Sequence, residues 1–238
     1  KLHYGCRFFT EFSVKEMCGV GGFGRVFKVE NKYDKTLYAV KRIAVYPSCM
    51  DKALDEVCKM AALNHPGIVR YNHTWVEEPP EEWQNRMDRI ELGIESNFED
   101  DVFIYIQMEL YNSSLAEWLK ENQKASARIR PLILLWFKEI VAAVGYLHEK
   151  NIIHCDLKPA NILFDDRHAI KLCDFGIATE RIMENGEEIT VTRDGGGSDL
   201  YKSPEQFSFM TRYSSKTDIF TLGLILAEML IVMSNEDR

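Results

Sequence analysis

The sequence predicts an α+β fold of two lobes, a small β-rich amino-terminal lobe and a helical carboxyl-terminal lobe. Three observations support this prediction. The 238 residues are 46% hydrophobic and 28% charged, a globular composition that excludes a disordered tail, collagen and a disulfide mini-protein. The first third of the chain alternates as strands do, whereas helical signals dominate beyond residue 110. The length allows two small lobes, and ligands often bind in the cleft between lobes.

Strand signals organise the first lobe. Alternating apolar residues lead into a glycine cluster, residues 25–30 alternate again, and residues 37–43 form another strand-like run. Ser48 and Asp51 fit a capping box for a helix that ends near residue 63. The β-prone run 102–110 predicts a further strand.

Helical signals organise the second lobe. Ser114 and Glu117 fit a capping box for a short helix. Pro131 suits the first turn of an apolar helix that continues to about His148. The stretch 219–233 is apolar on almost every side, so we expect a buried helix there.

The charge of the chain is concentrated in one segment. Residues 77–101 hold ten acidic and two basic side chains, so this segment carries the net charge of the whole chain, −8. A dedicated nucleic-acid-binding protein would show a basic stripe instead. We therefore expect no nucleic-acid partner.

The cysteines and apolar stretches bear on location. The six cysteines include no C-x-x-C pair and no Cys/His cluster with zinc spacing, so we expect reduced thiols and a cytoplasmic location. The longest apolar stretch, residues 219–233, is too short for a membrane span and contains Glu228. No signal peptide is visible, and no membrane contact is expected within this chain. The first residue, Lys1, suggests a piece of a longer protein.

A glycine-rich loop at residues 19–26 fits G-x-G-x-x-G-x-V. By itself this signal is weak, and a glycine-rich hairpin without a ligand is the alternative. A dinucleotide-binding fold requires a helix after such a loop, but residues 25–30 alternate like a strand. The Gly-Lys-Ser/Thr ending of a Walker A loop is also absent. The pattern favours a flap whose backbone N–H groups cover the phosphates of a nucleotide.

Four further motifs follow in order. Residues 38–41 read Tyr-Ala-Val-Lys, residues 154–161 read His-Cys-Asp-Leu-Lys-Pro-Ala-Asn, residues 174–176 read Asp-Phe-Gly, and residues 203–205 read Ser-Pro-Glu. They resemble the V-A-I-K strand, the H-R-D-L-K-x-x-N catalytic loop, the D-F-G triplet and the A-P-E triplet of protein kinases. Over essentially its whole length the chain is similar to a eukaryotic protein kinase, which implies the bilobal protein-kinase fold.

The resemblance implies a catalytic and metal-binding set. Asp156 would orient the attacking hydroxyl or accept its proton, and Lys158 would neutralise the transferring phosphoryl group. Asn161 and Asp174 would hold two Mg²⁺ ions, which prefer oxygen ligands. A lysine two residues after the catalytic aspartate resembles the serine/threonine kinases.

The resemblance also implies an ATP site. Lys41 would pair with the α- and β-phosphates and be held by Glu56, for which a solvated helix acid is the alternative. Met108 matches the gatekeeper, although a plain core role is equally open, and residues 109–111 match the hinge. The implied nucleotide-binding residues are Gly19, Val20, Gly21, Gly22, Phe23, Gly24, Val26, Ala39, Lys41, Met108, Glu109 and Tyr111.

Other segments point to one branch of the family. Residues 65–72, Trp75 and residues 79–84 are similar to the kinases of translation initiation factor 2 alpha. The segment around Trp83 and the acidic insert most resemble the branch that senses unfolded protein in the endoplasmic reticulum (the PERK branch). The resemblance implies that the alpha subunit of this factor is the substrate, and that translation is down-regulated under stress. It also allows the parent protein an anchor in the endoplasmic reticulum membrane, with the kinase facing the cytosol.

That family dimerises back to back through its small lobes, using an arginine, an acid four residues later and a tyrosine. Arg7, Glu11 and Tyr71 match these positions, which implies a homodimer. The alternative is an ordinary surface pair at i, i+4, which stabilises its helix by only about 0.2–0.5 kcal/mol.

Two departures from the family pattern raise alternatives. Cys155 replaces the arginine of H-R-D, whose planar donor group binds the activation-loop phosphate in most kinases. We therefore expect phosphorylation of the loop, with Thr190, Thr192 and Ser198 as acceptors, to be weakly coupled to activity. A pseudokinase scaffold and an active serine/threonine kinase with another substrate are the competing hypotheses.

The second departure is the end of the chain. Residues 217–223 resemble the central helix of the large lobe, and the sequence stops soon after. We expect an N-lobe at 1–108 that includes the acidic insert 77–101, a hinge at 109–111, and a partial C-lobe at 112–238, truncated after its central helix. Without the later helices, much of the helix at 219–233 would be exposed and the chain poorly soluble.

Overall fold

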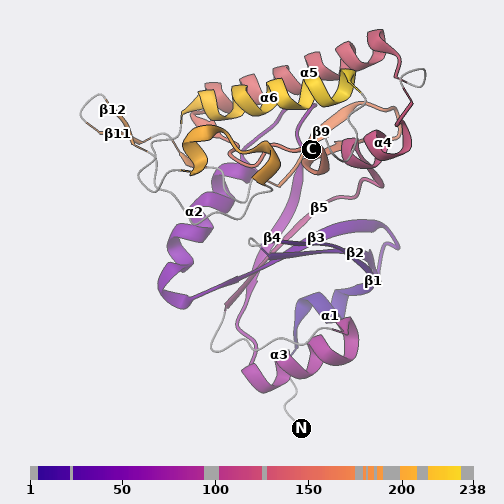
Figure 1. Cartoon of the computed structure of the whole chain (residues 1–238). Helices are drawn as coiled ribbons and strands as arrows, with labels where there is room; N and C mark the ends of the chain where they lie inside the picture. Colours follow the sequence, from indigo (N-terminus) through magenta and orange to yellow (C-terminus); the bar gives the residue numbers. More distant parts are fainter. Residues whose placement is uncertain are drawn as a thin grey trace. The chain divides into compact units, whose positions relative to one another are not determined.

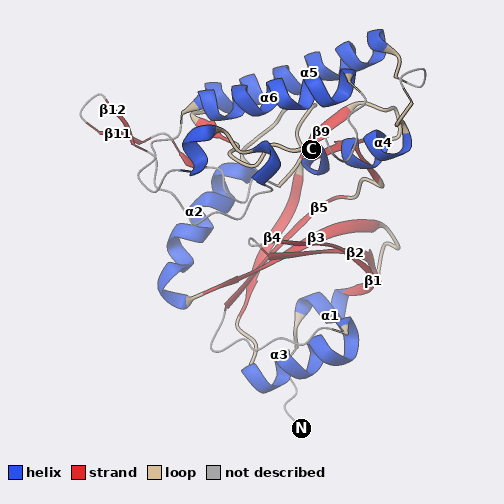
Figure 2. Ribbon diagram, viewed as in Figure 1, coloured by secondary structure: helices blue, strands red, loops and turns tan. Residues whose placement is uncertain are grey.

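A computed structural model describes residues 5–21, 24–93, 102–124, 128–174, 179–180, 182–184, 187–189, 199–207 and 214–231. At positions 52, 56, 179–189 and 199 it describes no side chain. By its contacts the chain divides into two compact units. Residues 1–63 and 70–110 form the first, which is mainly strands, and residues 64–69 and 111–238 form the second, which is richer in helices (Figure 2). The fold is the predicted α+β type.

The first unit is built on an antiparallel sheet of five strands in the order β1-β2-β3-β5-β4 (Figure 1). The strands are β1 (Phe12–Gly21), β2 (Gly24–Asn31), β3 (Leu37–Val45), β4 (Tyr71–Glu77) and β5 (Val102–Glu109). β1 and β2 pair from Phe12 opposite Asn31 to Gly21 opposite Gly24. The predicted order of strand, glycine loop and strand is therefore confirmed.

Short helices accompany the sheet: α1 (Arg7–Glu11), η1 (Pro47–Cys49), α2 (Met50–Ala61), α3 (Glu81–Met87) and the π-helix η2 (Asp88–Leu92). The capping box predicted at Ser48 is wrong. Ser48 lies inside η1, and α2 has Cys49 as its N-cap without a side-chain cap bond. Proline suits the first turn of a helix, and Pro47 begins this helical turn before Ser48 could cap it.

The core of the first unit is aromatic. Trp75 lies between Phe12 and Tyr105, with ring centroids 5.8 Å and 5.1 Å away. Phe8 stacks on Tyr105 at 5.0 Å. The buried cluster consists of Cys6, Phe8, Phe12, Phe27, Val29, Val40, Phe103 and Tyr105. Aromatic contacts of this kind add to the stabilisation from buried area.

Part of the acidic segment packs against this core. Trp83 of α3 contacts Phe9 of α1 edge-to-face at 5.9 Å, and Figure 1 shows α1 and α3 beside one another. Leu92 of η2 also packs against the cluster. Asp88 is fully buried and accepts two hydrogen bonds from Arg42 of β3, both 2.7 Å long. The first half of the insert is therefore an integral part of the unit.

The second unit contains two long helices together with short helices and short strands. Its elements are β6 (Ser113–Ser114), α4 (Leu115–Glu121), α5 (Arg130–Glu149), β7 (Ile152–Ile153), η4 (Pro159–Asn161), β8 (Ile162–Phe164), β9 (Ile170–Leu172), β10 (Thr179–Glu180), β11 (Ile182–Glu184), β12 (Glu187–Ile189), η5 (Asp199–Tyr201), η6 (Pro204–Phe207) and α6 (Ser215–Leu230). α5 and α6 lie side by side (Figure 1). The capping box of Ser114 and Glu117 is present, and a proline lies in the first turn of α5, as predicted.

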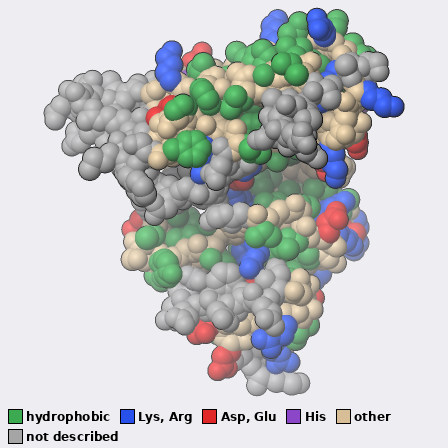
Figure 3. All heavy atoms as spheres, in the orientation of Figure 1, with side chains coloured by type: hydrophobic (Ala, Val, Ile, Leu, Met, Phe, Trp, Pro, Cys, Tyr) green, Lys and Arg blue, Asp and Glu red, His purple; other side chains and the backbone are tan. Residues whose placement is uncertain are grey.

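The burial of α6 is one-sided. Leu222, Ile225 and Met229 are buried, but Ile219 and Phe220 are 50% and 42% exposed. The expectation of a buried helix thus holds for one face only, and the expected exposure is seen on the other. Figure 3 shows apolar side chains on the visible face of the helical unit.

α5 is long and apolar enough, by length and composition alone, to cross a membrane. Core helices of soluble proteins pass the same test. α5 buries one stripe, Ile133, Trp136, Ile140 and Leu147, inside the second unit, and leaves Leu134 and Leu135 exposed.

Candidate active site

The predicted catalytic residues of the second unit lie together in the loop between β7 and β8. The Nζ atom of Lys158 is 2.7 Å from Oδ2 of Asp156. The Nδ2 group of Asn161 donates to the backbone oxygen of Asp156 at 2.8 Å and to its Oδ2 at 3.1 Å. Asp156 and Asn161 are buried, and Lys158 is half-buried. The loop therefore places a carboxylate, an ammonium group and an amide within hydrogen-bond distance of one another.

A buried carboxylate on α6 fixes the start of this loop. Asp218 accepts hydrogen bonds from the backbone N–H of His154 at 2.9 Å and from that of Cys155 at 3.0 Å. The Nε2 atom of His148 lies 2.7 Å from Oδ2 of Asp218. Sequence reasoning gave Asp218 no role, although an acid in the first turn of a largely apolar helix is a usable signal.

The backbone has an unusual conformation at two positions of the predicted site. Cys155 has φ 62° and Asp174 has φ 61°, a left-handed conformation that costs free energy for residues other than glycine. At Cys155 the bond to Asp218 holds the backbone in place. Such conformations cluster at functional sites. Here Cys155 precedes the predicted catalytic Asp156, and Asp174 is itself a predicted metal ligand.

The predicted metal ligands come from adjacent segments. The backbone N–H of Cys173 donates to the carbonyl of Asn161 at 2.9 Å, which brings the start of the D-F-G motif beside Asn161. Because Nδ2 of Asn161 bonds to Asp156, its amide oxygen is the atom suited to a cation. The carboxylate of Asp174 supplies the same type of ligand, so the donor set fits a hard cation. Phe175 and Gly176 lie outside the described residues.

Within the described part of the chain, no group of three or more His, Cys, Asp and Glu side chains could hold a metal ion. A cation at Asn161 and Asp174 would therefore need oxygen ligands beyond these two side chains. Mg²⁺ is commonly bound in this way, by one or two protein carboxylates together with substrate phosphates and water.

The glycine loop lies in the first unit. Gly19, Val20 and Gly21 end β1, and Gly24 and Val26 begin β2, whereas Gly22 and Phe23 lie outside the described residues. Gly24 has φ 117°, and a Cβ atom there would lie 2.2 Å from the carbonyl oxygen of Arg42. The backbone conformation and this close approach therefore require glycine at position 24, independently of any ligand of the loop.

The other predicted nucleotide-binding residues lie on β3 and β5. Lys41 is 6% exposed and pairs in register with Val26 of β2 and Ile106 of β5. Ala39 lies opposite Met108. Met108 is buried, which agrees with the core role and leaves the gatekeeper role open.

Two further predictions concern the hinge and the partner of Lys41. β5 ends at Glu109, and the division into two units falls between Leu110 and Tyr111, inside the predicted hinge. Glu56 lies on α2, but its side chain is outside the described part. The pair of Lys41 and Glu56 therefore stays a prediction.

Comparison with known proteins decides the family. Residues 12–234 match the family model of the protein kinase domain. The chain belongs to the protein kinase family. ATP and a divalent metal are the general requirements of this family, and the relatives place the chain among the serine/threonine kinases.

Three relatives illustrate the similarity. The interferon-induced, double-stranded RNA-activated protein kinase of Rattus norvegicus is 38% identical over 98% of this chain and 43% of the relative. Eukaryotic translation initiation factor 2-alpha kinase 3 of Bos taurus is 35% identical over 72% of the chain and 16% of the relative. The eIF-2-alpha kinase GCN2 of Schizosaccharomyces pombe is 28% identical over 96% and 20%. The chain spans about two fifths of the length of the first of these proteins. These identities agree with membership of the protein kinase family. They do not assign the chain to the branch of any one of these three relatives.

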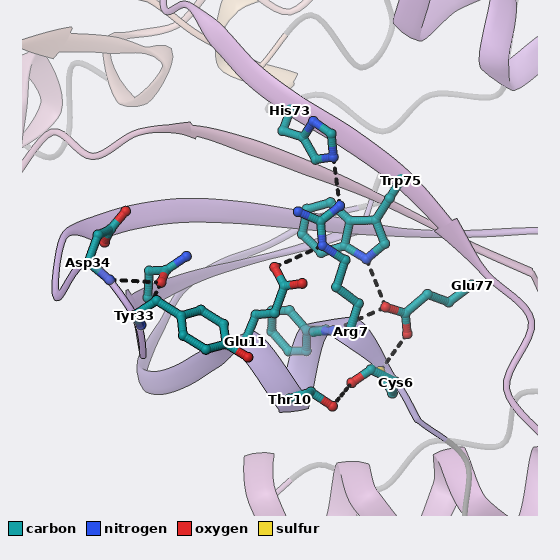
Figure 4. Close-up of polar contacts among 11 residues, drawn as sticks. Cys6, Arg7, Thr10, Glu11, Tyr33, Asp34, His73, Trp75 and Glu77 are labelled. Atoms are coloured by element: carbon teal, nitrogen blue, oxygen red, sulfur yellow. Dashed lines mark hydrogen bonds and ion pairs between the residues drawn. The ribbon is translucent and has the colours of Figure 1, made fainter.

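Two of the three residues predicted to form a dimer, Arg7 and Glu11, contact each other within the chain (Figure 4). Nε of Arg7 lies 2.9 Å from Oε2 of Glu11, one helical turn away. The guanidinium of Arg7 also contacts Nε2 of His73 at 2.6 Å and lies over the Trp75 ring, 4.6 Å from its centroid. This is the i, i+4 pair that the alternative describes. The homodimer through Arg7, Glu11 and Tyr71 stays a prediction.

Beside Arg7 lies a buried polar cluster around Glu77 that the sequence did not predict (Figure 4). Glu77 accepts hydrogen bonds from the thiol of Cys6, from the indole N–H of Trp75 at 2.8 Å and from the backbone N–H of Phe8 at 3.1 Å. Burial, together with the Glu77 carboxylate, raises the pKa of the Cys6 thiol. The cluster ties α1 to β4 and so fixes the helix that carries Arg7.

Proposed function

We propose that this kinase domain transfers the γ-phosphate of ATP, with Mg²⁺, to a serine or threonine hydroxyl of the alpha subunit of translation initiation factor 2. The contact between Asp156 and Lys158, with Asn161 bonded to the same carboxylate oxygen, carries the proposal of catalysis. The substrate is supported by two relatives that are named as kinases of this factor. Under this proposal the protein down-regulates translation under stress.

Phosphoryl transfer requires little covalent chemistry from the protein itself. Phosphoryl transfer is catalysed by positioning and by stabilising negative charge. Asp156 would accept the hydroxyl proton, and the ammonium group of Lys158 would stabilise the charge of the transferring group. Asn161 and Asp174 would hold Mg²⁺, which neutralises phosphate charge when bound. Lys41, the glycine loop and the Met108 to Tyr111 segment would position ATP.

Location and assembly are further parts of the proposal. The six free thiols support a cytoplasmic location. The match of Arg7, Glu11 and Tyr71 to the family's dimer residues supports a back-to-back homodimer. Size-exclusion chromatography with light scattering on wild type and Arg7→Glu would test the dimer. The wild type should have the mass of a dimer and the variant that of a monomer, and the same mass for both proteins would count against this interface.

The proposal is tested by phosphate transfer from Mg·ATP to purified alpha subunit, with Asp156→Asn as the blank. Transfer that the blank lacks would support it. A folded protein that binds Mg·ATP but transfers no phosphate to any protein would favour a pseudokinase scaffold, the alternative that Cys155 suggests. Transfer to other proteins but not to the alpha subunit would show an active kinase with a different substrate.

A further inference from the structure

One side chain links the catalytic loop to the Ser-Pro-Glu segment. Nε2 of Gln206 donates a hydrogen bond to the carbonyl oxygen of Cys155, 2.9 Å away. Oε1 of the same amide accepts from the backbone N–H of Ser203 at 2.9 Å and from its hydroxyl at 3.3 Å. Both ends of the Gln206 amide are thus engaged, one with each segment, and all three residues belong to the second unit.

The residue that Gln206 contacts precedes the catalytic aspartate. The N–H of Cys155 donates to Asp218 and its carbonyl accepts from Gln206, so side chains from two other segments hold the peptide groups on either side of it. Cys155 is 7% exposed, with a left-handed backbone. Because Asp156 follows directly, these two bonds hold the backbone from which its carboxylate projects.

The segment that carries Gln206 is also anchored on α6. The Thr217 hydroxyl donates to the Glu205 carboxylate at 2.9 Å, and the Thr221 hydroxyl donates to the carbonyl of Tyr201 at 2.8 Å. The Tyr201 hydroxyl contacts the Glu228 carboxylate. These three contacts hold residues 201–205 on α6.

A guanidinium at position 155 could bind a loop phosphate through its planar fork, but a thiol offers at most one weak donor. We propose that Gln206 is a positioning residue that couples the segment 203–207 to the catalytic loop through the Cys155 carbonyl, so that catalysis depends on this amide more than on phosphorylation of the loop. This inference rests on the proposed kinase function and concerns the regulation of the same site.

The variant Gln206→Glu separates the two ends of the amide. A carboxylate can still accept from Ser203, but it cannot donate to the Cys155 carbonyl and it repels that oxygen. We expect kcat to fall about tenfold or more, which is the effect of losing one well-placed hydrogen bond. KM for ATP is expected to stay at the wild-type value, because Gln206 has no place in the nucleotide-binding set.

Two further variants keep the test interpretable. Gln123→Glu makes the same change at an exposed position outside the site and is expected to leave kcat unchanged. Gln206→Met keeps the length of the side chain without adding charge and is expected to reproduce the loss of kcat. Melting temperature is measured for each protein. A loss of kcat that simply follows the melting temperature would overturn the inference.

The decisive comparison sets Gln206→Glu against wild-type kinase treated with phosphatase. The inference predicts a larger loss of kcat in the variant than in the treated protein. The inference is overturned if phosphatase treatment lowers kcat more than Gln206→Glu does. It is also overturned if the wild type is active and Gln206→Glu has the same kcat. Absence of transfer by the wild type itself would overturn the proposed function together with this inference, so the two failures are distinguishable.

Discussion

Arg42 and Asp88, which are 46 residues apart, form a buried ion pair in which both Nη atoms of the guanidinium lie 2.7 Å from the two carboxylate oxygens. The two side chains are 1% and 0% exposed. Gln84 adds a hydrogen bond to the same carboxylate at 2.6 Å. The aromatic rings of Phe27 and Phe103 flank the guanidinium. Since Arg42 follows Lys41 on β3, this pair ties the acidic insert to the strand that carries the predicted phosphate-binding lysine.

Asp88→Asn is expected to lower the free energy of unfolding by roughly 3–5 kcal/mol, because it leaves the Arg42 charge buried without its counter-ion. Asp166→Asn, an exposed position, serves as the matched control. Denaturant unfolding measures both. The double variant Arg42→Met/Asp88→Leu should recover much of the loss, since apolar residues of similar volume replace buried ion pairs well. Equal stability of Asp88→Asn and the control would contradict the structural role of the pair.

Gly24→Ala and Gly19→Ala should differ although both change the glycine loop. Gly24 has φ 117°, and a Cβ there would lie 2.2 Å from the Arg42 carbonyl oxygen, whereas a Cβ on Gly19 would meet nothing within 4 Å. Thermal unfolding should show a loss on the order of 1–3 kcal/mol for Gly24→Ala and little change for Gly19→Ala. Similar melting temperatures for the two variants would show that the backbone conformation at Gly24 is not the constraint.

The stability of the second unit should depend on pH through His65. Burial, followed by the nearby Lys171 cation, lowers the pKa of His65 below its ordinary value of 6.5. Nδ1 of the ring accepts from the Gly67 N–H at 3.0 Å, which requires the neutral imidazole. The unfolded chain thus binds the proton more readily, so the stabilisation is present above pH 6.5 and is lost as the pH falls through the folded pKa.

His65→Asn keeps an acceptor for Gly67 without a titrating group. Urea unfolding of the two proteins as the pH falls from neutral to mildly acidic should show a decline in the wild type that is weaker in the variant. Parallel curves would indicate that other groups carry the pH dependence.

Local sequence signals predicted much of the fold. Features that depend on contacts between distant residues could not be predicted from the sequence. Alternation identified β1 and β2, and the Ser114 and Glu117 capping box was found because it depends on four consecutive residues. Nothing in the acidic run separates Glu77 and Asp88, which are buried, from the other acids of the same segment. Their burial depends on Cys6 and Arg42, 71 and 46 residues away.

In the candidate site, too, local motifs predicted some residues, and others were missed because they act through long-range contacts. Motif spacing identified Asp156, Lys158 and Asn161, which the structure brings together. Asp218 and Gln206 were missed as supports because they act on backbone groups of residues 154 and 155. The position of Asp218 in an apolar helix marks it as unusual, but no local pattern identifies the backbone groups that either side chain contacts.

The most direct test measures phosphate transfer and Mg·ATP affinity side by side for wild type, Asp156→Asn and the exposed control Asp166→Asn. We predict that Asp156→Asn loses transfer to the alpha subunit by about a hundredfold or more while it keeps its Mg·ATP affinity, and that the control matches the wild type. Transfer by Asp156→Asn at the wild-type rate would contradict the assignment of this loop as the catalytic centre.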